Sequence, residues 1–190
     1  MVIKILPVGM LETNCCIIAD DGTKDAAVID PGDEIDKILK ETEKNGFKVK
    51  QVIITHNHPD HTGAAVELKE KTGAGIYMGE KEINYNNLPV DVKLKDGGVY
   101  KVGGLEYKAL STPGHSPGSV CIVFEKEKVI FSGDTLFCRG IGRVDLPGGD
   151  MGKMENSLKE LTSLDGSYKV YPGHGPETTI EEEKDGNPFL

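Results

Sequence analysis

One segment constrains the fold more than any other feature of this sequence: Thr55-His56-Asn57-His58-Pro59-Asp60-His61. It places three imidazoles and a carboxylate within six residues, directly after an apolar run with the length of a buried strand. Residues two apart in an extended segment point to the same side, so His56 and His58 can converge on one cation. The proline then turns the chain, which allows Asp60 and His61 to face a neighbouring position. The fold must therefore hold this segment at the end of a strand, where other elements can complete a metal site.

The missing donors are found in three later turns of the chain. His115 lies in Thr-Pro-Gly-His-Ser, Asp134 in Ser-Gly-Asp-Thr, and His174 in Pro-Gly-His-Gly, each in or beside a glycine turn that follows a predicted strand. Glycine lets the backbone bend close to a ligand without a side-chain clash. Imidazole nitrogen and carboxylate oxygen suit zinc and similar divalent ions. We therefore expect these turns to share one edge of the fold with the histidine-rich segment and to bind metal.

The apolar patterning predicts a mixed α/β fold. Short β-rich runs open the chain as a β-meander, and spacings of three and four residues predict helices later. The predicted strands are Val2 to Val8, Asn14 to Ala19, Ala26 to Ile29, Val49 to Thr55, Leu105 to Leu110, Ser119 to Phe124, Lys128 to Phe131 and Tyr168 to Tyr171; the predicted helices are Asp33 to Lys44, Gly63 to Lys71 and Met154 to Leu164. His56 to Thr62 is expected to be a polar loop, and Glu181 to Asp185 with the tail to Leu190 a loosely ordered end. Recurrence of strands and helices in both halves favours a four-layer αβ/βα sandwich, one domain over residues 1–190.

Composition limits the partners and the location. The net charge of −9 disfavours a nucleic-acid partner, because such binding draws on clustered Lys and Arg. No apolar run approaches the roughly 20 residues that span a bilayer, and the N-terminus lacks a signal-peptide pattern. We therefore expect a cytoplasmic protein with no membrane association. The four cysteines show no disulfide or zinc-ribbon spacing and are interpreted as reduced thiols.

The motif His-x-His-x-Asp-His, followed by the three later turns, resembles the metallo-β-lactamase superfamily over nearly the whole chain. This resemblance implies the metallo-β-lactamase fold and two metal positions, with Asp134 bridging them. It assigns His56, His58 and His115 to one metal, and Asp60, His61 and His174 to the second. The expected cofactor is a pair of divalent ions, zinc in the first place, with iron or manganese as alternatives.

Within the superfamily, the stretches Ser132 to Phe137 and Gly140 to Arg143 resemble the glyoxalase II group, the hydroxyacylglutathione hydrolases, in a short form without their C-terminal helical domain. Arg143 matches the basic substrate residue of that group, whereas two expected aromatics are replaced by Asp145 and Pro176. Aspartate at 134, where the best-known secreted β-lactamases carry cysteine, argues against antibiotic hydrolysis. Histidine at 58, where flavodiiron proteins carry glutamate, argues against a di-iron reductase.

These residues predict a hydrolase that cleaves thioesters of the hydroxyacyl-glutathione type with a metal-bound hydroxide. Asp60 and Asp134 are the expected catalytic carboxylates and Arg143 the substrate-binding residue, while Cys138 is interpreted as a small packing residue.

The main alternative is a persulfide dioxygenase, which the stretch from Gly140 to Asp145 also resembles. Such an enzyme would bind one iron through His56, His115 and Asp134. A superfamily nuclease is a further alternative, disfavoured by the acidic charge. The sequence assigns neither the thiol carrier, nor the acyl group, nor the oligomeric state.

Overall fold

The first half of the chain builds one six-stranded sheet. β1 (Val2–Val8), β2 (Thr13–Ala19) and β3 (Asp25–Ile29) pair in antiparallel register, which confirms the predicted β-meander. β4 (Lys48–Ile54), β5 (Gly75–Gly79) and β6 (Val92–Leu94) then join in parallel. Parallel neighbours need a crossover, and α1 (Ile35–Lys44) provides it before β4, α2 (Pro59–Thr62) and α3 (Ala65–Thr72) before β5. The computed structural model describes all residues from 1 to 190.

The second half builds another six-stranded sheet, in the order β14-β13-β10-β9-β8-β7. Its strands are β7 (Val99–Val102), β8 (Leu105–Ser111), β9 (Val120–Phe124), β10 (Val129–Gly133), β13 (Lys169–Pro172) and β14 (Thr178–Thr179). A small hairpin of β11 (Leu136–Phe137) and β12 (Gly140–Ile141) follows β10, and the helices are α4 (Met151–Thr162) and α5 (Ile180–Gly186). Only β10 and β13 pair in parallel, joined by a crossover that contains α4.

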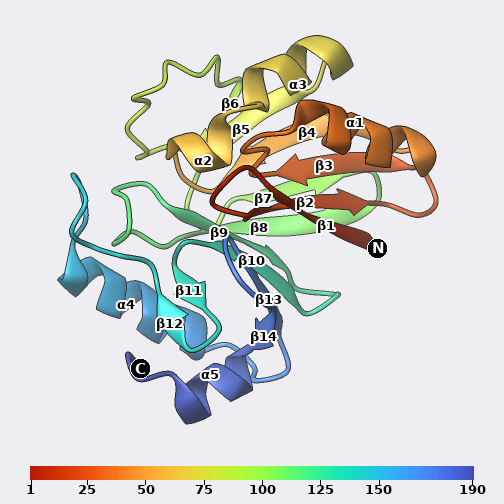
Figure 1. Ribbon diagram of the computed structural model, residues 1–190. Coiled ribbons are helices and arrows are strands. Elements are labelled where there is room, and N and C mark those ends of the chain that lie inside the picture. The colour runs from red at the N-terminus through yellow and green to blue at the C-terminus, as the bar shows by residue number, and fades with distance from the viewer.

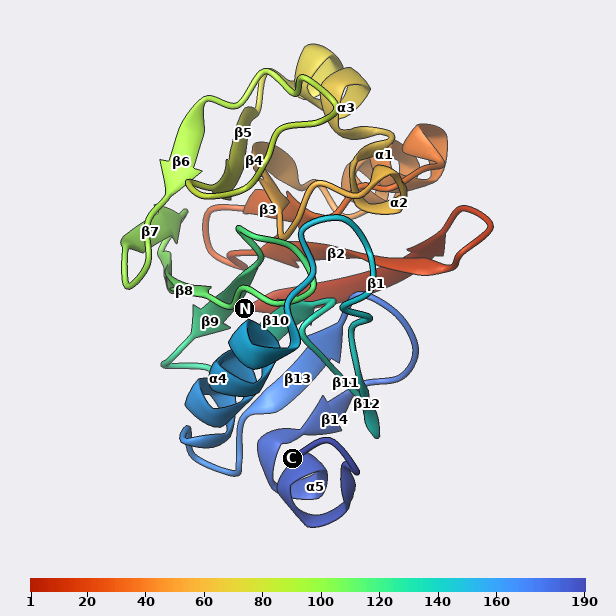
Figure 2. The ribbon, with the colours of Figure 1, turned by 90° about the vertical axis from the view of Figure 1, so that its left-hand side faces the viewer.

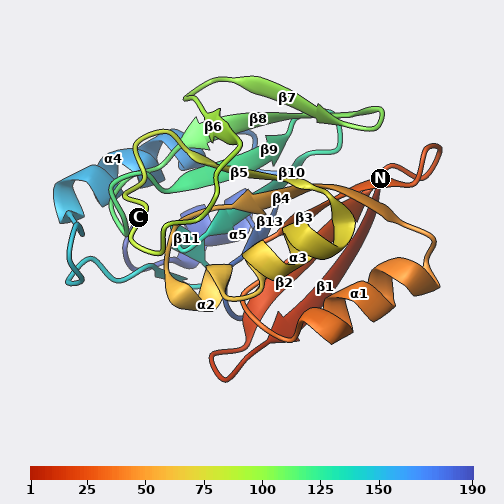
Figure 3. The ribbon, with the colours of Figure 1, turned by 90° about the horizontal axis from the view of Figure 1, so that it is seen from above.

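Four layers result, as the sequence predicted. Figure 1 and Figure 2 show α1 and α3 on one outer side, the two sheets between, and α4 and α5 on the opposite side. Seen from above, α1, α2 and α3 lie over the first sheet (Figure 3). The arrangement is the αβ/βα sandwich expected from the sequence (Figure 1). None of the five helices has the length and apolar character needed to cross a bilayer.

Three apolar cores separate these layers. Because successive strand residues point to opposite faces, Ile17 packs under the helices of the first sheet while Ile18 packs between the sheets. In β9, Ile122 faces the inter-sheet core, whereas Cys121 and Val123 face the core under α4. Both faces of each sheet are covered, so the central strands are continuous apolar runs rather than alternating ones.

Two expectations about local structure were wrong. The segment from His56 to Thr62 is not all loop, because Pro59 begins the short helix α2, a first-turn position that proline favours. The charged stretch Glu181 to Asp185 is not loosely ordered either. It lies within α5, where the Thr179 side chain accepts a hydrogen bond from the Glu182 backbone N–H, and Ile180 and Glu183 are buried.

Candidate metal centre

The predicted ligands meet at one edge of the sandwich, just beyond the carboxyl ends of four strands. β4 leads into His56, His58, Asp60 and His61, whereas β8, β10 and β13 lead into His115, Asp134 and His174 respectively. All seven residues that the sequence singled out as ligands lie in this single cluster, as the shared-edge prediction required.

Three histidines form a first ligand group. His115 Nε2 lies 3.2 Å from His56 Nε2 and 2.9 Å from His58 Nδ1. His56 and His115 are buried, and His58 is half-buried. The three nitrogens are close enough to share one metal ion.

A second group lies directly beside the first. His174 Nε2 lies 3.3 Å from His61 Nε2 and 3.2 Å from Asp60 Oδ2. Asp134 stands between the groups, with Oδ1 3.4 Å from His61 Nε2 and Oδ2 3.6 Å from His115 Nε2. Asp134 Oδ2 also lies 3.8 Å from His174 Nε2, so the carboxylate contacts donors of both groups, as expected of a ligand that joins them.

The donor set fits divalent metal ions. Asp134 Oδ1 is buried and has no hydrogen-bond partner, although buried carboxylate oxygens in proteins nearly always have one. Ring nitrogens face one another in both groups, an arrangement in which only one nitrogen of each pair can donate. A cation shared by these lone pairs would satisfy both features, and nitrogen with carboxylate oxygen is a donor set typical of zinc and related ions.

The second nitrogen of four rings is held by the surrounding protein. His115 Nδ1 donates to the Arg143 carbonyl at 2.7 Å and His174 Nδ1 to the Leu11 carbonyl at 3.0 Å. His61 Nδ1 lies 3.0 Å from Asp30 Oδ2. These contacts keep a proton on Nδ1 and direct Nε2 into the cluster, where a metal ion would replace any second proton on the ring.

His56 shows the same arrangement through Thr55. The Thr55 hydroxyl donates its one hydrogen to Asp30 Oδ2 at 2.7 Å, so its contact of 3.1 Å with His56 Nδ1 must be an N–H donation from the ring. Asp30 also accepts from the Thr55 backbone N–H at 2.8 Å. One buried carboxylate therefore orients a histidine of each group.

The electrostatics of the two groups differ. Burial lowers the pKa of His56 well below its usual value, so this ring is neutral and ready to bind metal. Burial acts in the same direction on His61, but the charge and hydrogen bond of Asp30 outweigh it and raise the pKa of His61 to about 9. Burial raises the pKa of Asp60, yet His174 and His61 outweigh it and hold the pKa below the usual range. Asp60 is therefore ionised, with Oδ2 accepting a hydrogen bond from Thr13.

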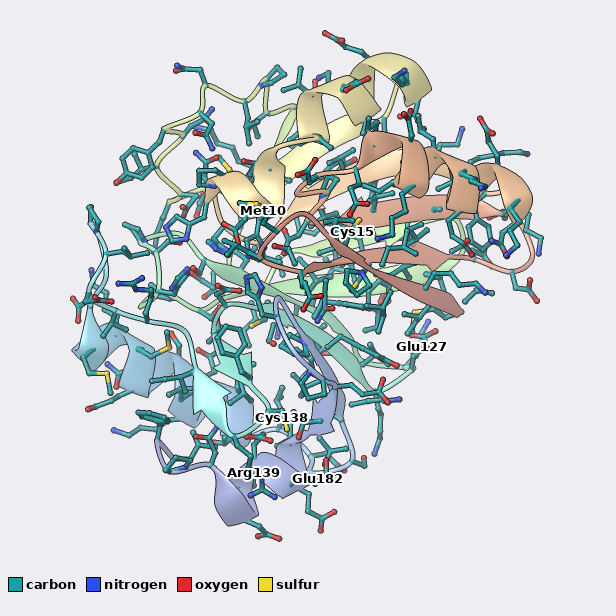
Figure 4. All side chains as sticks on the ribbon, in the orientation of Figure 1. Met10, Cys15, Glu127, Cys138, Arg139 and Glu182 are labelled. Atoms are coloured by element: carbon teal, nitrogen blue, oxygen red, sulfur yellow. The ribbon has the colours of Figure 1, made fainter.

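Arg143 lies beside the centre but its charge is already paired. Its backbone carbonyl holds His115, whereas its exposed side chain donates from Nε and Nη2 to the two oxygens of Asp145, at 2.8 and 2.7 Å. This hydrogen-bonded pairing raises the pKa of Arg143 and lowers that of Asp145. Cys138 is half-buried in the β11–β12 turn next to Arg139, on the α5 side of the molecule (Figure 4).

Sequence reasoning missed the residues that support the ligands. Asp30, Thr13, Thr55 and Glu82 were not singled out as supports of the ligands. The one available signal was position, since Asp30 and Thr55 each follow directly after a buried apolar run and so lie at the same sheet edge as the ligands.

Comparison with known proteins agrees with this geometry. Residues 8–174 match the family model described as the metallo-beta-lactamase superfamily. The chain belongs to this superfamily. Among superfamily members, hydroxyacylglutathione hydrolase GloC of Haemophilus influenzae is 37% identical over 100% of the chain and 98% of its own length. The crystal structure of BLEG-1, described as a B3 metallo-beta-lactamase, gives a TM-score of 0.94 at 33% identity, covering 100% of this chain and 99% of that one. ETHE1 from Myxococcus xanthus gives 0.90 at 31% identity, covering 99% and 84%. The superfamily binds divalent metals. The three similar proteins are a hydroxyacylglutathione hydrolase, a B3 metallo-beta-lactamase and ETHE1, so the similarity by itself does not select one activity.

Proposed function

We propose that this chain is a binuclear metal-dependent hydrolase that cleaves thioesters of the hydroxyacyl-glutathione type. The observation that carries the proposal is the pair of ligand groups with Asp134 between them. His56, His58 and His115 would hold one ion and Asp60, His61 and His174 the other, with zinc as the expected metal. The similarity to GloC over the full length of both chains supports the substrate class.

The residues around the centre have distinct tasks in this reaction. Divalent ions held by these residues would supply Lewis acidity, which lowers the pKa of a bound water and polarises a thioester carbonyl. Ionised Asp60, fixed by Thr13, accepts a hydrogen bond from the attacking water and aims its lone pair at the carbonyl carbon. Asp134 holds the two ligand groups at a fixed separation. These side chains are held in place before substrate arrives, which reduces the entropy cost of reaching the transition state.

The leaving group needs little help from the protein. The thiolate of a thiol with a pKa of about 8.5 is a weak base and departs without a dedicated general acid. Arg143 is the expected contact for a substrate carboxylate, but that carboxylate must compete with Asp145 for the guanidinium. We therefore expect thioester cleavage with weak saturation by glutathione substrates.

A persulfide dioxygenase is the second candidate. His56, His115 and Asp134, the three residues that would bind a single iron in such an enzyme, also converge here: His115 Nε2 is 3.2 Å from His56 Nε2 and 3.6 Å from Asp134 Oδ2. The similarity to ETHE1 favours the same alternative. A persulfide dioxygenase would differ from the hydrolase in requiring one metal ion and molecular oxygen.

One series of measurements separates the candidates. Metal content is determined on protein purified without added metal, followed by assays with lactoyl-glutathione, a glutathione persulfide and a β-lactam, the last because of the similarity to BLEG-1. We expect close to two divalent ions per chain and hydrolysis of the thioester. One iron per chain, with oxygen consumed on the persulfide and no thioester hydrolysis, would replace the proposal with the dioxygenase. β-Lactam turnover that exceeds thioester turnover would also overturn it.

A further inference from the structure

Glu82 is a buried carboxylate close to the first ligand group, on the connection between β5 and β6. Its Oε1 accepts a hydrogen bond from the backbone N–H of Asn57 at 3.2 Å. Its Oε2 accepts from the Ser116 hydroxyl and from the Gly118 backbone N–H, both at 2.7 Å. Asn57 separates His56 from His58, and Ser116 directly follows His115. One side chain therefore joins the two loops that carry this group.

The surrounding contacts leave Glu82 and its hydrogen-bond partners little freedom to move. The Asn57 side chain donates to the Ile83 carbonyl at 2.9 Å, and the Ser116 hydroxyl lies 2.6 Å from that of Ser119. A Cβ on Gly118 would lie 2.0 Å from the Glu82 backbone nitrogen, so the Ser116 loop and the segment that carries Glu82 touch with no room for a side chain. Hydrogen bonds to an ionised acceptor are shorter and stronger than neutral ones. Removing the carboxylate would therefore weaken the connection between the Asn57 loop and the Ser116 loop.

The second ligand group rests on other supports. His61 is held by Asp30, His174 by the Leu11 carbonyl and Asp60 by Thr13. None of these three contacts includes Glu82 or the loop on which it lies. Asp30 supports both groups, because it also orients His56 through Thr55. Glu82, in contrast, contacts only the loops that carry the first group.

We propose that Glu82 is a positioning residue that sets the metal affinity of the first ligand group, His56, His58 and His115, independently of the second. It does so by fixing the distance between the loop at Asn57 and the loop at Ser116. The inference concerns metal occupancy and holds whichever reaction the centre performs. It is therefore separate from the proposed thioester hydrolysis.

Glu82→Gln is the sharpest variant. Glutamine keeps the size but offers a single acceptor oxygen, so its amide nitrogen must face the Asn57 N–H or the Ser116 and Gly118 donors. Loss of a partner bonded directly to a ligand typically weakens metal binding 10- to 100-fold. Because Glu82 acts through the neighbouring Asn57 and Ser116, we expect the lower end of that range, about 10-fold, for zinc binding by the first group, and a change of less than about twofold for the second. Glu80→Gln, two residues away and exposed, is the matched control.

Competition with a zinc chelator measures the two affinities, and histidine ring nitrogen shifts in NMR spectra identify which group empties first. Ser116→Ala removes one of the three hydrogen bonds and should weaken the same group by a smaller factor. It also tests the proposal if Glu82→Gln does not fold. Equal weakening of both groups, or a lower melting temperature with both affinities intact, would show that Glu82 serves only general stability and would overturn the inference. So would unchanged binding in Glu82→Gln.

Discussion

Gly173 offers a steric test of the bridging carboxylate. A Cβ built on this glycine would lie 2.2 Å from Asp134 Oδ1 and 2.8 Å from His61 Cε1, closer than the 3.0 Å that real Cβ atoms keep. In Gly173→Ala the carboxylate must therefore retreat by about 0.8 Å. A misplacement of roughly 1 Å at a reacting centre costs on the order of 100-fold in rate, or about 2.7 kcal/mol. We expect a loss of that size in kcat/KM for lactoyl-glutathione, together with 10- to 100-fold weaker metal binding.

The fold itself should survive this change. Overpacking costs about 1–3 kcal/mol, and each kcal/mol lowers the melting temperature by about 2–4 °C in a chain of this size. Gly22→Ala is the matched control, because its nearest atom would be Asp20 Oδ1 at 3.6 Å, an ordinary contact far from the site. Metal content by mass spectrometry, steady-state kinetics and calorimetry of metal-free protein give the three readouts. Wild-type metal content and rate in Gly173→Ala would refute the placement of Asp134 between the groups.

Three further predictions concern neighbouring residues. Asp134→Ala should reduce bound metal from two ions toward one and abolish most thioester turnover; full occupancy in elemental analysis would contradict its bridging role. In metal-free protein the pKa of His61 is raised to about 9, so its stabilisation is complete below about pH 6.5 and is lost as pH rises through 9, by about 3 kcal/mol at most. Urea titrations should show this fall, and Asp30→Asn should flatten it. Asp145→Ala frees the Arg143 guanidinium and should lower KM for lactoyl-glutathione, whereas Arg143→Ala should raise it modestly; the opposite order would mean that the guanidinium does not bind substrate.

The parts of the fold that could be predicted are those whose signal is local. β1 has the predicted bounds, whereas α1 and α3 each begin two residues later than predicted and α3 ends one residue later. The sequence did not reveal β5, which is only five residues long and has glycine at both ends. It also misjudged α5, because its run of charges hides Ile180 and Glu183, the two residues that pack inward. Their burial depends on contacts with distant elements.

The same contrast holds for the site. The candidate ligands could be predicted because they lie in short motifs in which each residue is a recognisable metal donor. Their supports were not, since Asp30 lies 25 residues from its partner Thr55, and Glu82 lies 34 residues from Ser116. A lone acidic residue on a loop has no sequence pattern that distinguishes a buried anchor from a solvated charge. Only the packing of the two sheets brings these partners together.

The ligands come from both sheets of the sandwich: one segment follows β4 in the first sheet, and three turns follow β8, β10 and β13 in the second. Ions bound by all of them would act as a cross-link between two halves of the chain, in addition to the apolar core between the sheets and hydrogen bonds such as those from Ser116 and Gly118 to Glu82. Backbone amides along the ligand-bearing edge should then exchange their hydrogens slowly in loaded protein and much faster after chelation. The opposite edge, around β14 and the N-terminus of β1, should be far less affected. Metal content would thus control how often the two sheets separate transiently at the edge that carries the ligands.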